Sequence, residues 1–395
     1  MRIVLTSMPV ISHLVPLVVP LAQALGRAGH EVAVATGAAM AEELDRLGVR
    51  HLPLRRALAP DQFGQDPELA RSIGLDANGA PIADAAPTDP GEAFGRLFAG
   101  AYAVRSAEDL LEALDGWPPD LVVRECTEFG GYLAGERLGV RQAVLDHVPL
   151  VPTRHPGMLG PLNKSRAALG LPSVTDVAAA LTRHPWFGAM PAQWSPSASP
   201  SSAERHYRLT AAPDQDPLDP AIAALPSDRP LVLATLGSNT GHMLTGDPIL
   251  EHVVEALGAL PCQAVVALGA HQDPRAWTGP RPGNVHLTSF VQQRLLLPAC
   301  DLFVTHAGAN GIRESLAAGV PMVAVPLFAD QPVNAARLAD LGLGLTVRPE
   351  DVGTALADTC RRVLDDPGFR QRARGFQRQM LALPGVDQLI ADFTG

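Results

Sequence analysis

Apolar and polar positions follow two different periods from the start of the chain. Residues 2–6 form a short apolar run with β-branched side chains, which predicts a strand. Apolar residues then recur at helical spacing from Leu17 to Ala28, and Gly29 ends the predicted helix. Residues 31–36 form the next predicted strand. Strand, helix and strand in this order make a βαβ unit, and repeated units build a parallel sheet.

The same order returns further along the chain. Residues 120–123 predict a strand, which a loop and a helix ending near Gly139 follow. Residues 57–93 have no clear period and predict a long surface excursion of the kind that often carries binding loops. Residues 191–229 are rich in Ser, Pro and Asp and predict a break between two domains.

A second series of alternating elements follows this break. The predicted strands are 231–236, 263–268, 302–305 and 322–327, the predicted helices are 249–260, 311–318 and 332–341, and two terminal helices, 366–382 and 386–393, separate at Pro384. The expected fold class is therefore α/β, with two doubly wound parallel sheets. We expect an N-terminal domain at 1–208, a linker at 209–228 and a C-terminal domain at 229–395.

Composition narrows the function classes. Of the 395 residues, 47% are hydrophobic and 18% charged, which excludes disorder as the main state. A net charge of −10 argues against a nucleic-acid partner and against a polybasic membrane anchor. The four cysteines lie far apart, which is typical of free thiols in a reducing compartment. No two His or Cys residues lie within four positions of each other, so local zinc-ligand spacing is absent.

The apolar N-terminus does not have the pattern of a targeting segment. Pro9, Pro16 and Pro20 interrupt the apolar run, and a strand-like segment follows where a cleavage site would stand. No stretch of 18 residues is apolar enough to span a bilayer. We therefore expect a soluble cytoplasmic protein without stable membrane association.

Candidate chemistry lies in the loops after strands, because ligands of open parallel sheets bind beyond the carboxyl ends of the strands. His13 follows the first strand and is a candidate general base, with a helix cap or a plain surface histidine as the alternative. Glu125 follows the strand at 120–123 and would fix the tautomer of His13 by bonding its far nitrogen. Glu128 is a competing partner, and a solvated loop acid is the alternative for Glu125.

Three further loops are candidates in the C-terminal half. Gly237 and Ser238 form a small turn that suits a phosphate, although the Gly-Lys-Ser/Thr of a Walker loop is missing. Residues 305–311 form a small-residue loop at a helix N-terminus, which favours an anion site with His306 as an added donor. A tight turn whose small residues serve packing is the alternative. Glu314, one turn into that helix, is placed to accept from a ribose diol.

The third loop carries Asp330 and Gln331, a carboxylate and an amide that together can grip sugar hydroxyls. Capping of the helix that begins at Pro332 is the alternative, and both roles can hold together. Asp214-Gln215-Asp216 matches an Asp-x-Asp pattern that can hold a metal, but it lies in the predicted linker and is interpreted as a linker acid. We predict no metal and no resident cofactor.

The segment 289–344 resembles the donor-site signature of nucleotide-sugar-dependent glycosyltransferases with the GT-B fold. Within the UDP-glycosyltransferase superfamily, it is most similar to the bacterial natural-product branch of antibiotic biosynthesis. The resemblance extends more loosely to His13 and to the segment from Asn163. It implies two Rossmann-like domains that face a cleft, with the acceptor on the N-terminal domain and the nucleotide sugar on the C-terminal one. It also implies an inverting, metal-independent transfer and a terminal helix that packs back on the N-terminal domain.

The resemblance assigns roles residue by residue. His13 matches the family's general base and Glu125 its acidic partner, which is often Asp. Gly311 departs from the pattern, because the family usually has Ser or Thr there, so Ser238 and backbone N–H groups would replace one phosphate-binding hydroxyl. The expected donor-binding residues are Gly237 and Ser238, then Phe290 and Val291 near the base, Gln293 near the base and ribose, His306, Gly308, Asn310 and Gly311 at the diphosphate, Glu314 at the ribose, and Asp330 and Gln331 at the sugar.

The resulting prediction is a transferase that moves a hexose or deoxysugar from a TDP- or UDP-sugar, its co-substrate, to a small natural-product aglycone. The alternatives are a nucleotide-sugar 2-epimerase, a transferase for cell-wall lipid intermediates, and a non-catalytic auxiliary partner. The sequence leaves open the acceptor, the choice between TDP and UDP, the choice between O-, N-, S- and C-transfer, and whether the chain forms a homodimer.

Overall fold

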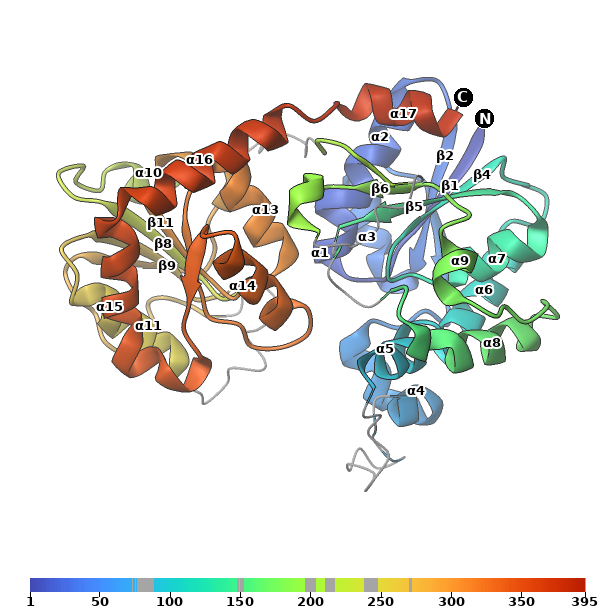
Figure 1. The fold of residues 1–395 in the computed structure, drawn as a ribbon, viewed down its shortest axis with the longest axis horizontal. Helices are drawn as coiled ribbons and strands as arrows, with labels where there is room; N and C mark the ends of the chain where they lie inside the picture. The colour runs from blue at the N-terminus through green and yellow to red at the C-terminus, as the bar shows by residue number, and fades with distance from the viewer. Residues whose placement is uncertain are drawn as a thin grey trace. The chain divides into compact units, whose positions relative to one another are not determined.

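The chain folds into two compact units in a computed structural model (Figure 1). Unit 1 is Met1–Ala212 together with Leu383–Gly395, and unit 2 is Pro213–Ala382. The structure describes residues 1–72, 74, 76, 89–147, 149, 153–195, 204–209, 217–237, 248–269 and 272–394.

Unit 1 is built on a seven-stranded sheet in the order β3-β2-β1-β4-β5-β6-β7. Every neighbouring pair is parallel. The chain order reverses between β1 and β4, so the carboxyl ends of these two strands form the switch point at which ligands of such sheets bind. The strands are β1 (Arg2–Thr6), β2 (Glu31–Gly37), β3 (His51–Leu54), β4 (Leu121–Glu125), β5 (Arg141–Asp146), β6 (Trp186–Gly188) and β7 (Glu204–His206).

The first helical segment of unit 1 begins earlier than predicted. α1 (Ile11–His13) continues through a π-helical stretch (Leu14–Val18) into α2 (Val19–Arg27). Pro16 has no N–H for the regular helical ladder, and a locally wider π-turn accommodates this loss. His13 therefore lies in the first turn of the helical segment, and the preceding loop ends at Val10.

The other helices of unit 1 cover both faces of the sheet (Figure 1). The prediction of a surface excursion at 57–93 is wrong for its first part. That part folds into short helices, and its Phe63, Leu69 and Ala70 are fully buried. These helices are α3 (Ala41–Arg46), a 3₁₀ segment (Pro60–Gln65), α4 (Pro67–Ser72), α5 (Pro90–Phe98), α6 (Ala101–Ala113), α7 (Gly130–Leu138), α8 (Leu159–Ala168) and α9 (Val177–Leu181), with short 3₁₀ turns at Ala38–Met40, Pro156–Met158 and Ala192–Trp194.

The last helix, α17 (Val386–Thr394), packs on unit 1. Phe393 is buried with its ring centroid 4.4 Å from that of Phe187 in β6. Arg205 of β7 forms a 2.7 Å ion pair with Asp392, and Tyr207 hydrogen-bonds to the same carboxylate. An apolar contact and a charged one thus hold the C-terminus on this unit.

Unit 2 has a six-stranded sheet in the order β10-β9-β8-β11-β12-β13, again parallel throughout. Its switch point lies between β8 and β11. The predicted strand at 322–327 is shorter than expected, and the strands β10 and β13 were not predicted. The strands are β8 (Leu231–Thr235), β9 (Gln263–Ala267), β10 (Val285–Thr288), β11 (Leu302–Thr305), β12 (Met322–Ala324) and β13 (Gly344–Thr346).

The predicted helices of unit 2 are present with shifted ends. Val253, Leu257 and Leu356 pack in its core against strand residues such as Val232 and Val304. The helices are α10 (Pro220–Ala223), α11 (Ile249–Gly258), α12 (Gln293–Leu296), α13 (Ala309–Ala318), α14 (Gln331–Asp340), α15 (Val352–Asp365) and α16 (Pro367–Leu381), with 3₁₀ turns at Leu297–Ala299 and Pro349–Asp351.

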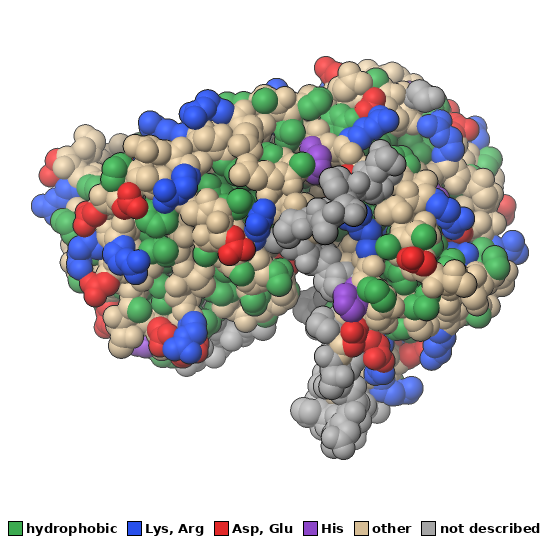
Figure 2. All heavy atoms as spheres, in the orientation of Figure 1, with side chains coloured by type: hydrophobic (Ala, Val, Ile, Leu, Met, Phe, Trp, Pro, Cys, Tyr) green, Lys and Arg blue, Asp and Glu red, His purple; other side chains and the backbone are tan. Residues whose placement is uncertain are grey.

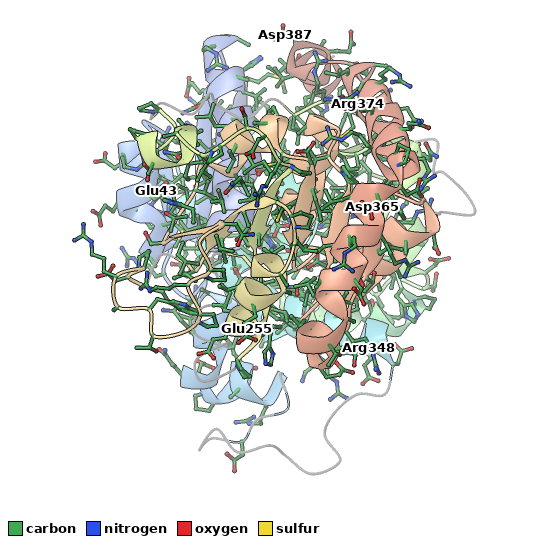
Figure 3. All side chains as sticks on the ribbon, turned by 90° about the vertical axis from the view of Figure 1, so that its left-hand side faces the viewer. Glu43, Glu255, Arg348, Asp365, Arg374 and Asp387 are labelled. Carbon is green, nitrogen blue, oxygen red and sulfur yellow. The ribbon has the colours of Figure 1, made fainter. Side chains whose placement is uncertain are left out.

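The surface carries charges of both signs. Arg348, Asp365 and Arg374 are exposed on unit 2 (Figure 3). On the face drawn in Figure 2, basic and acidic side chains mix over each unit without a basic stripe. Within the described residues, no helix is both long and apolar enough to cross a membrane.

Candidate active site

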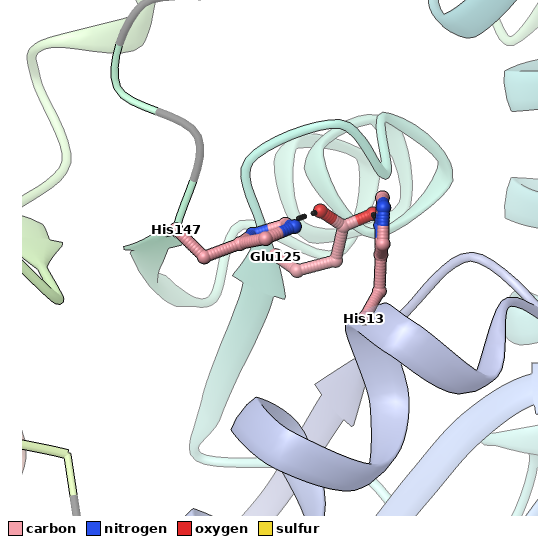
Figure 4. Close-up of side chains that lie close together, drawn as sticks. All are labelled: His13, Glu125 and His147. Atoms are coloured by element: carbon pink, nitrogen blue, oxygen red, sulfur yellow. Dashed lines mark ion pairs between the residues drawn. The ribbon is translucent and has the colours of Figure 1, made fainter. Parts of the chain in front are cut away.

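His13 and Glu125 meet at the switch point of unit 1. β1 and β4 are adjacent, so the loops after them lie side by side. His13 Nδ1 lies 3.6 Å from Glu125 Oε1 (Figure 4). The His13 side chain is 24% exposed, whereas that of Glu125 is fully buried. The carboxylate can therefore orient the ring from below while the rest of the imidazole remains accessible.

Glu125 is held from several sides. Thr127 donates to it through its hydroxyl at 2.5 Å and its backbone N–H at 2.9 Å. Burial alone would raise the pKa of Glu125, but its contacts with His13, His147 and Thr127 outweigh burial and lower the pKa to about 2. A carboxylate with this pKa stays ionised at neutral pH.

Glu128, the competing partner for His13, instead accepts hydrogen bonds from the start of α7. Its carboxylate accepts from the hydroxyl of Thr6 at 2.5 Å and from the backbone N–H groups of Gly130 and Gly131 at 2.7 Å each. These two N–H groups belong to the first turn of α7 and would otherwise be unsatisfied. Glu128 thus joins β1 to α7, and Glu125 is the acid beside His13.

Sequence reasoning missed His147 in this site. It follows β5 directly, and its Nδ1 lies 3.7 Å from Glu125 Oε2, on the side of the carboxylate opposite His13 (Figure 4). The centroids of the two imidazole rings are 4.5 Å apart. The available signal was positional, because His147 comes just after the short apolar run Ala143-Val144-Leu145, which was not assigned to a strand.

In unit 2, His306 follows β11 and packs against two glycines. A Cβ at Gly237, after β8, would stand 2.8 Å from the ring of His306, and a Cβ at Gly308 would stand 2.4 Å from its Nε2. Both loops therefore need glycine to close on this imidazole. Burial lowers the pKa of His306 to about 4, so at neutral pH the ring is uncharged and donates one N–H.

The loop after His306 leads into α13 at its N-cap, Gly308. Ala307 has a positive φ of 65°, which is unusual for a residue with a Cβ. Asn310 lies in the first turn of α13. A Cβ at Gly311 would lie 3.2 Å from the hydroxyl oxygen of Thr305, which is fully buried and accepts from the backbone N–H of Ala307. Ser238, the other expected hydroxyl, lies outside the described residues.

The expected ribose and base residues gather around α12 and α13. Gln293 Nε2 donates a 2.7 Å hydrogen bond to Glu314 Oε2. Phe290 is 66% exposed and offers a free ring face, whereas Val291 is only 5% exposed and packs in the core. Of these two residues, only Phe290 presents a side chain to a ligand, because Val291 is directed inward by the hydrophobic effect.

Asp330 and Gln331 follow β12 at the start of α14. Asp330 occupies the N-cap position but makes no side-chain cap, so the capping alternative is wrong for it. Asn334 donates to Asp330 Oδ2 at 2.6 Å and to the carbonyl of Ala307 at 3.1 Å, which ties this corner to the His306 loop. Gln331 is buried, and its Oε1 accepts from the N–H groups of residues 327 and 328 at 2.8 and 3.1 Å.

The chain is similar to known proteins along its whole length. Residues 251–393 match the family described as erythromycin biosynthesis protein CIII-like, C-terminal domain. The TDP-daunosamine transferase DnrS of Streptomyces peucetius is 27% identical over 99% of this chain and 95% of that protein. The 3-alpha-mycarosylerythronolide B desosaminyl transferase of Saccharopolyspora erythraea is 27% identical over 99% of this chain and 97% of its own length.

Among solved structures, the Streptomyces sp. SF2575 glycosyltransferase SsfS6 complexed with thymidine diphosphate has a TM-score of 0.73 to this chain. It is 23% identical and covers 100% of this chain and 99% of that one. The predicted GT-B fold and the predicted resemblance to antibiotic glycosyltransferases are thereby confirmed.

Proposed function

We propose that this chain, a glycosyltransferase of the GT-B fold, moves a sugar from a TDP-linked donor to a hydroxyl of a small natural-product aglycone such as a polyketide. The transfer inverts the configuration at the anomeric carbon and needs no metal. The observation that carries the proposal is the pair of a partly exposed His13 and a buried, ionised Glu125 at the switch point of unit 1.

The chemistry needs a base, because an acceptor hydroxyl has too high a pKa to attack unaided. Glu125 lies at Nδ1 of His13, so it favours the tautomer whose proton is on Nδ1. Nε2 is then free to take the acceptor's proton as its oxygen attacks the anomeric carbon from the face opposite the diphosphate. The buried carboxylate stabilises the imidazolium that results.

The donor's leaving group gains charge during the same step. The N-terminus of α13 offers backbone N–H groups and the positive end of the helix dipole to the diphosphate. The N–H of neutral His306 adds a hydrogen bond, so this stabilisation is dipolar and does not require a protonated histidine. Phe290 stacks on the base, Glu314 holds the ribose and Asp330 the sugar.

TDP is our preferred nucleotide because the relatives point to it. The relative from Streptomyces peucetius is named for a TDP-sugar, and SsfS6 was solved with thymidine diphosphate. UDP remains the competing donor for the experiment to test.

The deciding experiment incubates the chain in excess EDTA with a TDP-sugar and a panel of polyketide aglycones. We expect release of TDP that depends on the acceptor, with a glycoside whose anomeric configuration is opposite to that of the donor by NMR. The parallel reaction with the UDP-sugar should be slower. Retention of configuration, or activity that EDTA abolishes and Mg²⁺ restores, would contradict the mechanism.

A double variant tests the statement that the transfer needs no metal. Replacing Asp214 and Asp216 together by Ala removes the acidic pair that resembles a metal-binding pattern, although these residues lie outside the described structure. Transfer by this double variant should stay close to that of the unchanged chain.

A further inference from the structure

Three side chains with metal-ligating atoms converge in unit 1. One nitrogen each of His13 and His147 and an oxygen of Glu125 all lie within 4.8 Å of one another, and this is the one such group among the described residues. The three residues come from the end of α1, the end of β4 and the position after β5 (Figure 4). The proposed transfer uses two of them and leaves His147 without a role.

The separations are suited to an ion between the groups. Glu125 lies 3.6 Å from His13 Nδ1 and 3.7 Å from His147 Nδ1, and both distances exceed those of ordinary hydrogen bonds. Two ligands bound to a tetrahedral zinc at about 2.0–2.2 Å lie about 3.3–3.5 Å apart. Each His–Glu pair therefore needs to close by only a few tenths of an ångström.

We propose that His13, Glu125 and His147 bind a Zn²⁺ ion, with water as the fourth ligand, and that the bound ion suppresses sugar transfer. Two imidazoles and one carboxylate suit zinc better than Mg²⁺, which prefers oxygen ligands. Cys126 Sγ lies 3.7 Å from His147 Nδ1 and adds a soft atom to the surroundings. The ion would enter past His13, because the side chains of Glu125 and His147 are 0% and 2% exposed.

Binding also requires the two imidazoles to come together. Their ligand nitrogens lie within 4.8 Å of each other, whereas two ligand atoms on a tetrahedral zinc lie about 3.3–3.5 Å apart. His13 is the partly exposed member and lies in the first turn of a helical segment. A small rotation of its ring closes the site.

Suppression follows from the tautomer of His13, and this part rests on the proposed function. A neutral imidazole carries one ring proton. When Nδ1 gives its lone pair to zinc, that proton must be on Nε2. Nε2 then has no lone pair with which to take the acceptor's proton.

The binding test uses the full chain, freed of metal with EDTA and dialysed, in competition with a chromogenic zinc chelator. We expect one Zn²⁺ per chain, at least about 10-fold weaker binding in His147→Gln and His13→Gln, and no comparable binding of Mg²⁺. His155→Gln is the matched control, because His155 Nδ1 also lies 3.6 Å from a carboxylate, that of Asp89. This variant should bind zinc as the unchanged chain does.

Three results would overturn the site. They are absence of zinc binding, zinc binding that survives both His147→Gln and His13→Gln, and loss of zinc binding in His155→Gln. Circular dichroism melts check that the buried His147 variant folds, and the partly exposed His13 variant tests the same site if it does not. Transfer in EDTA that falls at least about 10-fold with stoichiometric Zn²⁺, and returns on adding EDTA, is expected. Unchanged transfer with zinc bound would overturn the suppression, whereas no transfer in EDTA would count against the proposed function alone.

Discussion

The side-chain amide of Gln293 donates a 2.7 Å hydrogen bond to the carboxylate of Glu314. The bond joins α12 to α13 and holds Glu314 one turn from the helix N-terminus at which we place the diphosphate. Preorganisation of this kind lowers the entropic cost of gripping a ribose. The donor-binding roles proposed for unit 2 can therefore be tested by binding experiments, separately from catalysis.

Glu314→Ala should weaken free TDP by about 10- to 100-fold, because each lost charged hydrogen bond is worth roughly 1.5–3 kcal/mol. Gln293→Ala should have a smaller effect, since the carboxylate stays. Asp330→Ala should leave free TDP almost unchanged and weaken the intact TDP-sugar. Calorimetry with both ligands on the three variants measures this. Equal losses of TDP in Glu314→Ala and Asp330→Ala would mean that the donor lies differently along the site.

His13→Ala should lower kcat by about 10²–10⁴-fold, the usual contribution of a general base. Affinity for TDP should change little, because the expected donor residues belong to unit 2. Steady-state kinetics and calorimetry on the same preparation check both statements. Near-normal turnover with a hydroxyl acceptor would remove His13 from the mechanism.

Glu125→Gln and Glu128→Gln should separate catalysis from stability. Glu125→Gln removes the charge beside His13 and should lower kcat by about 10-fold or more. Glu128→Gln disturbs the hydrogen bonds to Thr6 and to the start of α7, so it should lower the melting temperature with little change in kcat. A larger kcat effect from Glu128→Gln would reverse the two roles.

Gly308→Ala should displace the ring of His306, because the added Cβ would stand 2.4 Å from Nε2. We expect weaker TDP-sugar binding and slower transfer. Gly26→Ala in α2 is the matched control, since its Cβ would have no neighbour within 4 Å and alanine favours a helix. An unaffected Gly308→Ala variant would show that this ring has room to move.

His306 should make folding stability depend on pH. Its pKa is lowered to about 4 by burial, so between that value and the ordinary value of about 6.5 the unfolded chain binds a proton that the folded one does not. Burial of the neutral ring therefore costs no stability above pH 6.5. The free energy of unfolding falls by on the order of 3 kcal/mol as the pH drops from 6.5 towards 4. Urea unfolding at pH 7 and pH 5 should show a smaller pH effect in His306→Gln than in the unchanged chain. The same slope in both would place the titration elsewhere.

The local pattern predicted much of the fold. Alternating periods, with Gly29 ending a helix, predicted the βαβ series of both units, because these signals act over a few residues. Residues 60–72 were misjudged, since their short helices have too few turns to show a period and are stabilised by burial of Phe63 and Leu69. Helix ends such as Ile11 shifted for a similar reason, because a π-turn around Pro16 extends the helix beyond what the pattern indicates.

The sequence by itself determined the fold class, the GT-B resemblance, the strand-end positions of Glu125, His306 and Asp330, and the place of Glu314 one turn into a helix. Only the tertiary structure decided which groups meet. It set Glu125, and not Glu128, beside His13, turned Val291 into the core, and brought His147 against the same carboxylate. The physical reason is that spacing along one strand or helix fixes local direction, whereas contacts between β1, β4 and β5 depend on sheet order and packing over more than a hundred residues.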